Sequence, residues 1–550
     1  MLKTIKTKKN TTKYTLVALV AGFALLSVGS SYIHARSAHN SSNSNLSNIA
    51  TNTNTNTDGF QQSNHYNTPK GFMNDIQTIF KGTDDYYHLY YLLNKNYKSS
   101  NDGTEWYHIR TKDWEHFEDL GVAIPKFVNG WSAVASGSVY QNRNGFFRDL
   151  PKTAIIAYFT SYTETGQHQY AAYSLDDGRT YHPYNHSQPV MKAKSKEQNF
   201  RDPHVWYNES TKKLMMYLAE GDKVGIYSST DGKKWEYQGA TMLNGSTLDG
   251  KDLGLIECPN LKSFYDPQTK TTKHALLFGA NGYQYGSTTG SYYMIGHLEA
   301  NGNFVAEQQP ERLDYGTDYY GANYYQESLT RVKSIGWMGN WEYSQGQILK
   351  DDGQEAKHIG SMSSTHSLSM TQKDGKYVVR SRLINNNART SGLRTKQSAR
   401  TSKTAPDGYH KELLKVNRKA SQEISLHFAN NTANTKGHIR VFINQNDSRV
   451  SVDLNTETGT YEVKRNSSKI TGEAKNKYEK AYAVYNNWQN RQRYFVYLVA
   501  DKGSLEIAMP DGQIYSLMKL SSDPNMQVVV ESSTDNSVSA TLCDFQNKTR

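Results

Sequence analysis

Cysteine is scarce in this sequence, which limits how the fold can be held together. Cys258 and Cys543 are the two cysteines among 550 residues, and they lie 285 positions apart. Two cysteines of a secreted chain can pair, but these two fall in different predicted domains. We therefore expect both thiols to be free and buried, and the fold to depend on its hydrophobic core.

Long apolar runs are also lacking, apart from one near the N-terminus. Five lysines precede the apolar residues 15–28, a run too short to span a bilayer comfortably, and Ala35 and Ala38 suit a cleavage site. This pattern predicts a signal peptide over residues 1–38, with an uncleaved N-terminal anchor as the alternative. Once the signal is removed, we expect no stable membrane span and a secreted, extracellular protein.

The excess of positive charge belongs in large part to that leader. Residues 1–38 hold six basic and no acidic residues, so their removal lowers the formal charge from +11 to +5. We therefore expect no nucleic-acid partner, and at most a loose association with anionic cell-wall polymers at low salt. The histidines are scattered and no phosphate-binding motif occurs, so we expect no metal and no cofactor. Oligomeric state is not predicted.

Residues 39–60 are rich in Asn, Ser and Thr and contain the repeat TNTNTNTD at 51–58. Such a segment has too few apolar side chains to form a core, so we expect a disordered spacer.

Over residues 61–384 strand follows strand, and no segment shows a helical period. In a recurring unit, an apolar strand enters an Asp- or Asn-containing turn and an aromatic residue follows. The unit recurs about every 55–70 residues, the length of a four-stranded antiparallel sheet, which predicts a five-bladed β-propeller. A series of β-sandwiches is the alternative. The units are RTKDWEHF from Arg110, YSLDDGRTYHPY from Tyr173, YSSTDGKKWEY from Tyr227 and GHLEANGNF from Gly296.

The composition changes after the predicted propeller. Residues 385–419 hold nine basic and two acidic residues, which indicates a polar linker or loop region, with a polyanion-binding patch as the alternative. Residues 420–550 alternate between apolar and polar positions, with turn residues about every 8–12 positions, which is typical of a β-sandwich. The chain is therefore predicted to be all-β: a five-bladed β-propeller followed by a C-terminal β-sandwich.

Three acidic residues lie in short segments on the first, third and fourth predicted repeats: Asp75 in GFMNDIQTIF, Asp202 in QNFRDPHVWY and Glu257 in LGLIECPNL. Singly, each has an ordinary explanation: a turn cap, a partner of Arg201, or a position at a sheet edge. Together they can meet at the propeller axis, where innermost strands converge. Glycoside hydrolysis needs one carboxylate nucleophile and one protonated acid. Glu257 fits the acid, because a carboxylic acid in an apolar strand keeps its proton more readily.

These segments resemble the three acidic motifs of glycoside hydrolase family 32, the invertase, inulinase and levanase family. Residues 72–78 correspond to W-M-N-D-P-N-G, residues 201–203 to R-D-P and residues 257–259 to E-C-P. The resemblance implies a retaining double displacement, with Asp75 as nucleophile, Glu257 as general acid/base and Asp202 as transition-state stabiliser. It also implies substrate contacts, which map onto Asn74, Gln77, Trp106, Ser136 and Arg201. For Trp106, core packing within a blade is the alternative.

The sequence departs from the family around the first acid. Phe72, Ile76, Gln77 and Thr78 replace the family's Trp, Pro, Asn and Gly, and Leu92 replaces a Gln. We expect these changes to alter the wall of the pocket and to leave its acids unchanged.

The surrounding segments are similar to secreted endo-acting bacterial levanases, so the predicted substrate is a fructan or fructo-oligosaccharide, with levan as the main expectation. An exo-β-fructosidase or invertase-like enzyme acting on inulin or sucrose is an alternative, as is transfructosylation. A non-catalytic carbohydrate-binding or adhesion protein is the alternative of another class.

Overall fold

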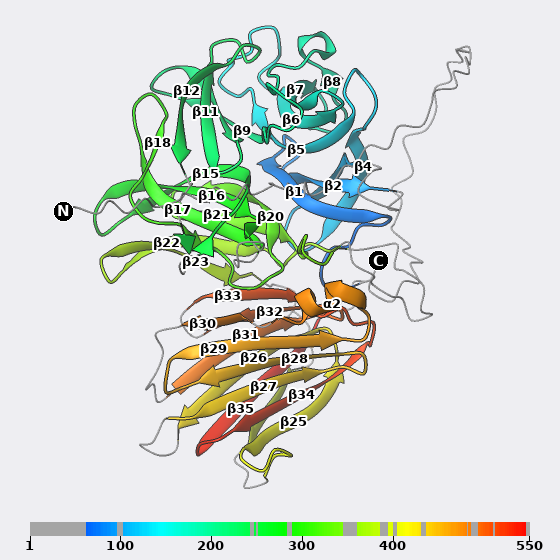
Figure 1. The fold of residues 1–550 in the computed structure, drawn as a ribbon, viewed down its shortest axis with the longest axis vertical. Helices are drawn as coiled ribbons and strands as arrows, with labels where there is room; N and C mark the ends of the chain where they lie inside the picture. Colours follow the sequence, from blue (N-terminus) through cyan, green and yellow to red (C-terminus); the bar gives the residue numbers. More distant parts are fainter. Residues whose placement is uncertain are drawn as a thin grey trace, which may run out of the picture.

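The computed structural model describes residues 62–95, 103–242, 247–248, 251–282, 289–344, 360–384, 394–399, 404–430, 436–480, 482–485, 493–509 and 512–545. The predicted signal peptide and spacer lie outside these residues. Two bodies rich in strands lie one above the other along the long axis of the molecule (Figure 1). The predicted all-β class is confirmed.

The upper body consists of five antiparallel sheets that follow one another along the chain. The sheets contain β1 (Phe72–Lys81), β2 (Tyr87–Asn94), β3 (Glu105–Thr111) and β4 (Phe117–Ile124); β5 (Ala133–Gln141), β6 (Ile155–Thr163), β7 (Gly166–Ser174) and β8 (His182–Pro183); β9 (Arg201–Asn208), β10 (Lys213–Ala219), β11 (Lys223–Ser229) and β12 (Glu236–Met242); β15 (Ile256–Asp266), β16 (Thr271–Ala280), β17 (Gly290–Leu298), β18 (Phe304–Ala306) and β19 (Glu311–Arg312); and β20 (Tyr320–Ser328), β21 (Arg331–Trp337), β22 (His366–Lys373) and β23 (Lys376–Leu383). A 3₁₀ turn (Asn185–Ser187) follows β8, and the short pair β13 (Thr247–Leu248) and β14 (Lys251–Asp252) precedes β15.

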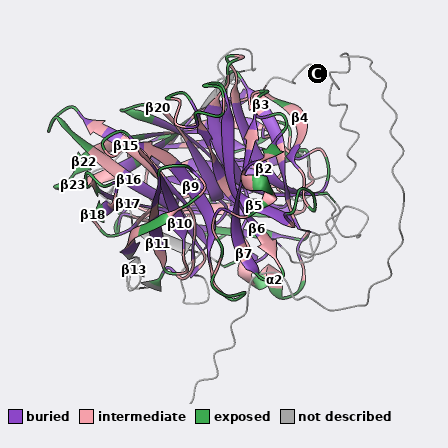
Figure 2. Ribbon diagram, turned by 90° about the horizontal axis from the view of Figure 1, so that it is seen from above, coloured by how far each residue is buried: buried purple, intermediate pink, exposed green. Residues whose placement is uncertain are grey.

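The five sheets close into a ring. The first strand of each sheet contacts the first strand of the next, and β1 contacts β20. A hydrophobic cluster fills each gap between neighbouring sheets; Tyr90, Trp106 and Phe159, for example, pack between the first and second. The second strands β2, β6 and β10 are therefore buried over nearly their whole length and are rich in apolar side chains, whereas β4, β22 and β23 include exposed positions. Seen from above, buried residues fill the strands (Figure 2).

The lower body is a sandwich of two six-stranded sheets. Its core is one cluster of inward-facing side chains from both sheets. In spatial order the sheets are β24 (Arg394–Ala399), β35 (Asn536–Asp544), β26 (Gln422–Asn430), β31 (Arg493–Ala500), β32 (Ser504–Ala508) and β33 (Ile514–Met518); and β25 (Lys411–Lys419), β34 (Asn525–Ser532), β27 (His438–Asn444), β28 (Ser448–Asn455), β29 (Thr460–Ser467) and β30 (Tyr482–Tyr485). A short helix, α2 (Gly472–Tyr478), follows β29.

The segment 385–419, expected to be a linker, contributes to the sandwich. Both β24 and β25 fall in it, and each forms an edge strand of a different sheet. The backbone of β24 pairs with β35 and that of β25 with β34, so these polar strands are held by backbone hydrogen bonds. The linker expectation is corrected for these strands.

The propeller and the sandwich share a buried polar junction. Arg465 of β29 forms an ion pair with Asp318, which precedes β20. The hydroxyl and backbone N–H of Ser516 donate to Asp314 at 2.7 and 3.0 Å. Met518 of the sandwich packs in the same cluster as Phe72 of the propeller. These contacts hold the sandwich against the side of the ring.

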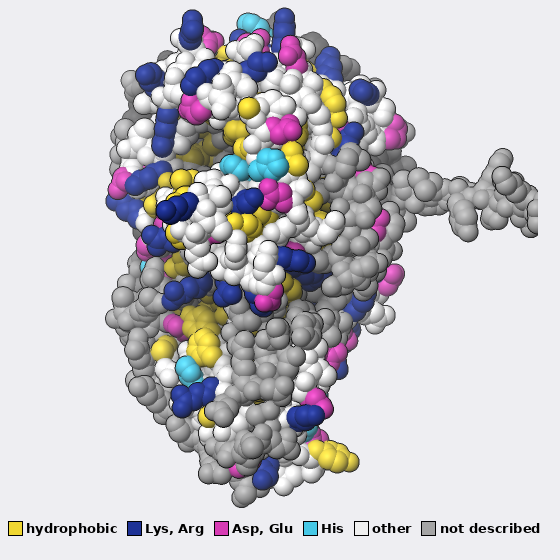
Figure 3. Space-filling model, turned by 90° about the vertical axis from the view of Figure 1, so that its left-hand side faces the viewer, with side chains coloured by type: hydrophobic (Ala, Val, Ile, Leu, Met, Phe, Trp, Pro, Cys, Tyr) yellow, Lys and Arg dark blue, Asp and Glu magenta, His cyan; other side chains and the backbone are white. Residues whose placement is uncertain are grey.

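The surface carries both signs of charge. On the face shown in Figure 3, basic and acidic side chains are interspersed. Among the described residues, no helix has the length and apolar character needed to cross a membrane.

Candidate active site

Every innermost propeller strand has a β-bulge at the same level. In each, two residues of the inner strand lie opposite one residue of its neighbour. A bulge bends its strand and redirects side chains, and bulges are frequent beside active sites. The bulged pairs are Asn74–Asp75, Ala135–Ser136, Asp202–Pro203, Cys258–Pro259 and Gly321–Ala322. Asp75, Asp202 and, one residue before its bulge, Glu257 are thereby brought to one level of the ring.

Asp75 is buried, with 8% of its surface exposed. Its two carboxylate oxygens accept different hydrogen bonds: Ser136 Oγ donates to Oδ2 at 2.9 Å, and Asn74 Nδ2 donates to Oδ1 at 3.3 Å. Burial, helped by the negative charge of Glu257, raises the pKa of Asp75, while these two hydrogen bonds act in the opposite direction. The donors fix the orientation of the carboxylate toward the shared space.

Asp202 is held by a backbone donor. The N–H of Cys258 donates to its Oδ2 at 3.0 Å, whereas the nearest approach of Arg201 is 4.0 Å. Burial raises the pKa of Asp202 to about 7, with Arg201 opposing and Glu257 adding to the rise. Arg201, considered from the sequence as a partner of Asp202, therefore contacts it only at this longer distance.

Arg201 binds Glu257 instead. Its Nη2 and Nε donate to Glu257 Oε1 at 3.0 and 3.2 Å, and the hydroxyl of Tyr320 donates to Oε2. The Glu257 side chain is 19% exposed, so its surroundings are polar and partly open, unlike the apolar strand expected from its neighbours in sequence. A charged donor on one oxygen and a phenol on the other orient this carboxyl group.

Sequence reasoning missed three residues of this cluster. Tyr320 begins β20, and only its contact with Glu257 marks it. Cys258 Sγ lies 3.6 Å from Asp75 Oδ2 and 3.7 Å from Asp202 Oδ2. Gly321, at φ +49, approaches so closely that an added Cβ would lie 2.5 Å from Asp75 Oδ1. The family motif contains Cys258, but no local sequence signal reveals its contacts with the acids or the close approach of Gly321, because these contacts join separate sheets.

Neither cysteine forms a disulfide, as expected, and Cys543 is buried. Cys258 is only half-buried and contacts two of the acids, so it belongs to this cluster. Burial and the neighbouring carboxylates raise the pKa of its thiol. Among the described residues, no group of three or more His, Cys, Asp or Glu is arranged to hold a metal ion.

The expected substrate contacts divide into two groups. Asn74, Ser136 and Arg201 lie in the acid cluster. Gln77 is 1% exposed; its Nε2 donates to Asp75 O at 3.1 Å and to Ser136 Oγ at 3.2 Å, so its amide joins β1 to β5.

Trp106 is 0% exposed and its Nε1 donates to Ala135 O at 2.8 Å. It packs between the first and second sheets, so it presents no face to a sugar and the core-packing alternative describes it.

The departures from the family motif also lie inside the protein. The side chains at four of these positions are buried: Phe72, Ile76, Thr78 and Leu92. Phe72 packs edge-on against Trp337 with ring centroids 5.8 Å apart. The expectation that these positions form the wall of the pocket is corrected: they change the packing behind the acids.

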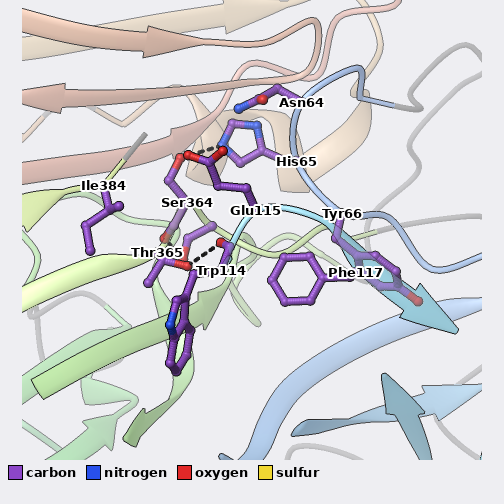
Figure 4. Close-up of a pocket in the computed structure, with 10 residues that line it drawn as sticks. Asn64, His65, Tyr66, Trp114, Glu115, Phe117, Ser364, Thr365 and Ile384 are labelled. Atoms are coloured by element: carbon purple, nitrogen blue, oxygen red, sulfur yellow. Dashed lines mark hydrogen bonds between the residues drawn. The ribbon is translucent and has the colours of Figure 1, made fainter. Parts of the chain in front are cut away.

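A separate pocket lies at the junction of the two bodies, away from the acids (Figure 4). Polar groups around it already have partners: Thr365 Oγ1 donates to Trp114 O at 2.8 Å, and Ser364 Oγ lies 3.2 Å from His65 Nε2. Among the residues that line this pocket, Glu115 is the one carboxylate, so the pocket lacks the group of acids found at the propeller axis. It is lined by Asn64, His65, Tyr66, Trp114, Glu115, Phe117, Ser363, Ser364, Thr365 and Ile384.

The architecture matches solved structures over nearly the whole chain. A β-fructofuranosidase from Schwanniomyces occidentalis, complexed with fructosyl-erythritol, aligns with a TM-score of 0.74 at 19% identity, covering 90% of this chain and 99% of that one. An exo-inulinase from Aspergillus awamori aligns with a TM-score of 0.72 at 18% identity, covering 89% and 98%. At these identities the likeness shows the fold, a propeller followed by a sandwich.

The sequence comparisons identify the family. Residues 65–381 match the model of the glycosyl hydrolases family 32 N-terminal domain. This chain belongs to glycosyl hydrolases family 32. A levanbiose-producing levanase of Bacillus subtilis is 33% identical over 331 residues, 58% of this chain and 60% of the relative. A second one, from Geobacillus stearothermophilus, is 33% identical over 54% of this chain and 73% of its own length. An extracellular exo-inulinase of Meyerozyma guilliermondii is 25% identical over 80% of this chain and 86% of its own.

Proposed function

We propose that this protein is an extracellular retaining glycosidase that cleaves β-fructofuranosyl bonds of fructans, with levan as its substrate. The observation that carries the proposal is the set of contacts that links the three acids at one level of the propeller ring. Cys258 contacts Asp75 and Asp202, and Arg201 binds Glu257 and lies 4.0 Å from Asp202. With Glu257 protonated and Asp75 and Asp202 ionised, these acids and Arg201 together carry net negative charge. Such a site suits a reaction that develops positive charge on a sugar ring.

Asp75 is the proposed nucleophile. Hydrogen bonds from Ser136 and Asn74 orient its carboxylate and favour its charged form. In the first step it attacks the anomeric carbon of the fructosyl unit, and the bond to the leaving oxygen breaks as the covalent fructosyl-enzyme forms. Its raised pKa means that the ionised, reactive form is lost at a higher pH than for an ordinary aspartate.

Glu257 is the proposed general acid/base. It donates a proton to the leaving oxygen in the first step and takes one from water in the second, when the ester to Asp75 is hydrolysed. Arg201 and Tyr320 contact its two oxygens and keep the group aimed. Asp202, held by the Cys258 N–H, accepts hydrogen bonds from sugar hydroxyls as charge develops on the ring.

The preference for levan rests on the comparisons. Two levanbiose-producing levanases are 33% identical to this chain, whereas the exo-inulinase is 25% identical. Invertase 1 of Saccharomyces cerevisiae is 32% identical over 51% of the chain, so action on sucrose is the second candidate. The levanase names favour release of short oligosaccharides ahead of fructose.

Substrate choice is tested by incubating the mature protein with levan, inulin and sucrose side by side. We expect the fastest release of reducing ends from levan, and chromatography of the first minutes should show levanbiose or longer products before fructose. Fructose alone from the earliest time point contradicts the endo-acting assignment. Faster turnover of sucrose than of levan would establish the second candidate instead.

The catalytic proposal is tested separately from substrate choice. Glu257→Gln and Asp202→Asn should each lower kcat on the preferred substrate by roughly 10²-fold or more, because each removes a group that acts in the transition state. A non-catalytic binding protein predicts bound fructan and no reducing ends from the wild type. That result would exclude the enzyme.

A further inference from the structure

The backbone at Asp202 has a conformation that its surroundings must maintain. Asp202 has φ +63, in the left-handed region that residues other than glycine rarely adopt. A residue held there is strained and keeps its conformation only when neighbouring groups over-determine it. The strand β9 that carries Asp202 is the innermost strand of its sheet, so one of its edges has no strand partner within that sheet. The second sheet provides the missing partners.

One set of hydrogen bonds holds the peptide from the N-terminal side. The N–H of Asp202 donates to Thr160 Oγ1 at 2.9 Å, and the Thr160 hydroxyl donates to Gln169 Oε1 at 2.9 Å. Gln169 Nε2 then donates to Phe200 O at 2.7 Å, two residues before Asp202. Thr160 and Gln169 are both 0% exposed, so water does not compete for these groups. These three hydrogen bonds therefore begin at the Asp202 N–H and end at the Phe200 carbonyl, and they tie both ends of this short segment to the second sheet.

A second contact holds the peptide from the C-terminal side. The hydroxyl of Ser138, on β5, donates to Pro203 O at 2.7 Å and accepts from Val205 N–H at 2.9 Å. Ser138 is 3% exposed. Its hydroxyl thus takes the place of a strand partner for two backbone groups just after the bulge at Asp202.

We propose that Thr160 and Ser138 are positioning residues that hold Asp202 in its bulge and aim its carboxylate at the sugar. The inference rests on the proposed role of Asp202 in catalysis. Neither residue is among the expected site residues, and both act through the backbone of the third sheet. A reacting group displaced by as little as about 1 Å can lose roughly 10²-fold in rate, so loss of either hydroxyl should reach the chemistry.

Thr160 offers a pair of variants at one position. Thr160→Val keeps the shape and removes the hydroxyl, whereas Thr160→Ser keeps the hydroxyl. We expect Thr160→Val to lower kcat on levan, or on whichever fructan proves best, about 10- to 100-fold with KM within about twofold. Thr160→Ser should stay within about threefold of wild type. Ser138→Ala, made independently, should behave as Thr160→Val does.

The sandwich offers a matched control for a loss of stability alone. Ser467 is 2% exposed, and its hydroxyl likewise donates to one backbone carbonyl (Leu520, 2.6 Å) and accepts from one backbone N–H (Lys469, 3.0 Å). Ser467→Ala should lower the melting temperature and leave kcat unchanged. Folding of each variant is followed by circular dichroism, and rates are corrected for the folded fraction.

The outcomes separate this inference from the function on which it depends. Wild-type kcat in folded Ser138→Ala and Thr160→Val, with an impaired Asp202→Asn, overturns the positioning role alone. An unimpaired Asp202→Asn overturns the proposed role of Asp202. If Thr160→Val does not fold, kcat of Ser138→Ala is compared with that of Ser467→Ala. A lower kcat in Ser138→Ala alone supports the positioning role, and equal kcat values contradict it.

Discussion

Two clusters of buried carboxylates, one at the propeller axis and one around His65, have pKa values shifted in opposite directions. At the propeller axis, burial raises the pKa of Asp75 and brings that of Asp202 to about 7. At the junction with the sandwich, hydrogen bonds and the charge of His65 overcome burial and hold the pKa values of Asp501 and Glu506 well below their ordinary range.

The difference lies in how many donors each carboxylate receives. Asp501 accepts from the backbone N–H groups of residues 63, 64 and 65, from Ser421 and from the His65 ring. Asp202 accepts from one backbone N–H, with a guanidinium 4.0 Å away. A fully satisfied buried network stabilises the fold, whereas an under-satisfied one leaves charge available to a ligand. We therefore expect the carboxylates around His65 to stabilise the fold and those at the propeller axis to take part in catalysis.

Asp75→Asn should show the largest effect, on activity alone. Removing the proposed nucleophile should lower kcat roughly 10⁴-fold, measured as reducing ends released from levan. The melting temperature at neutral pH should stay the same or rise, because the raised pKa shows that the ionised carboxylate is destabilising in the folded state. A large fall in melting temperature together with retained activity would reverse the assignment.

Asp501→Ala should have the opposite profile. The variant leaves His65 Nδ1 and three backbone N–H groups without this acceptor, while His65 Nε2 keeps Glu506. Breaking such a buried pair costs about 3–5 kcal/mol. Urea unfolding should report that loss, while kcat per folded molecule stays near wild type. Glu209→Ala is the control: its partner Lys212 and the glutamate itself are exposed, so the unfolding midpoint should barely move.

The junction also predicts the pH range of maximal stability. The pKa of His65 is raised from 6.5 to about 9, so its contribution, about 3 kcal/mol, is complete below pH 6.5 and is lost as the pH rises through 9. The lowered pKa values of Asp501 and Glu506 contribute stability above their ordinary values of 3.8 and 4.5, and it is lost as the pH falls. Melting temperature against pH should decline on the alkaline side in wild type and lose that decline in His65→Gln.

Gly321→Ala should lower activity, because its one added methyl group would displace the carboxylate of Asp75. The added Cβ would lie 2.5 Å from Asp75 Oδ1 at a residue with φ +49, so we expect kcat to fall about 10- to 100-fold. Gly375→Ala is the matched control: its φ is +75 and no atom lies within 4 Å of the added Cβ. It carries a similar backbone cost without touching the acids. Equal kcat for the two variants would show that the close approach does not matter.

Ser136→Ala should give the smallest effect, a displaced pH profile. Its hydrogen bond lowers the pKa of Asp75, so its loss should raise that pKa further. The acid limb of kcat/KM against pH should then move toward higher pH. An unmoved acid limb would mean that another group controls it.

The large-scale layout could be predicted because it depends on local patterns. Hairpin turns with a following aromatic marked the propeller sheets, and period-two alternation marked the sandwich strands. The strands at residues 394–399 and 411–419 were not predicted, because a polar edge strand has the composition of a linker. Only pairing with β35 and β34 identifies these segments as strands. Trp106 was misplaced because an aromatic residue in a strand packs equally well against a sugar or a neighbouring sheet.

By itself, the sequence determined the all-β fold class, the family motifs and the acids at 75, 202 and 257, because each is written in contiguous residues. Only the tertiary structure decided that Arg201 pairs with Glu257, that Cys258 touches two acids, that Gly321 must lack a side chain, and that Thr160 and Ser138 hold the Asp202 backbone. These contacts join strands of different sheets at β-bulges, which the local sequence pattern does not predict. They exist only once the ring has closed.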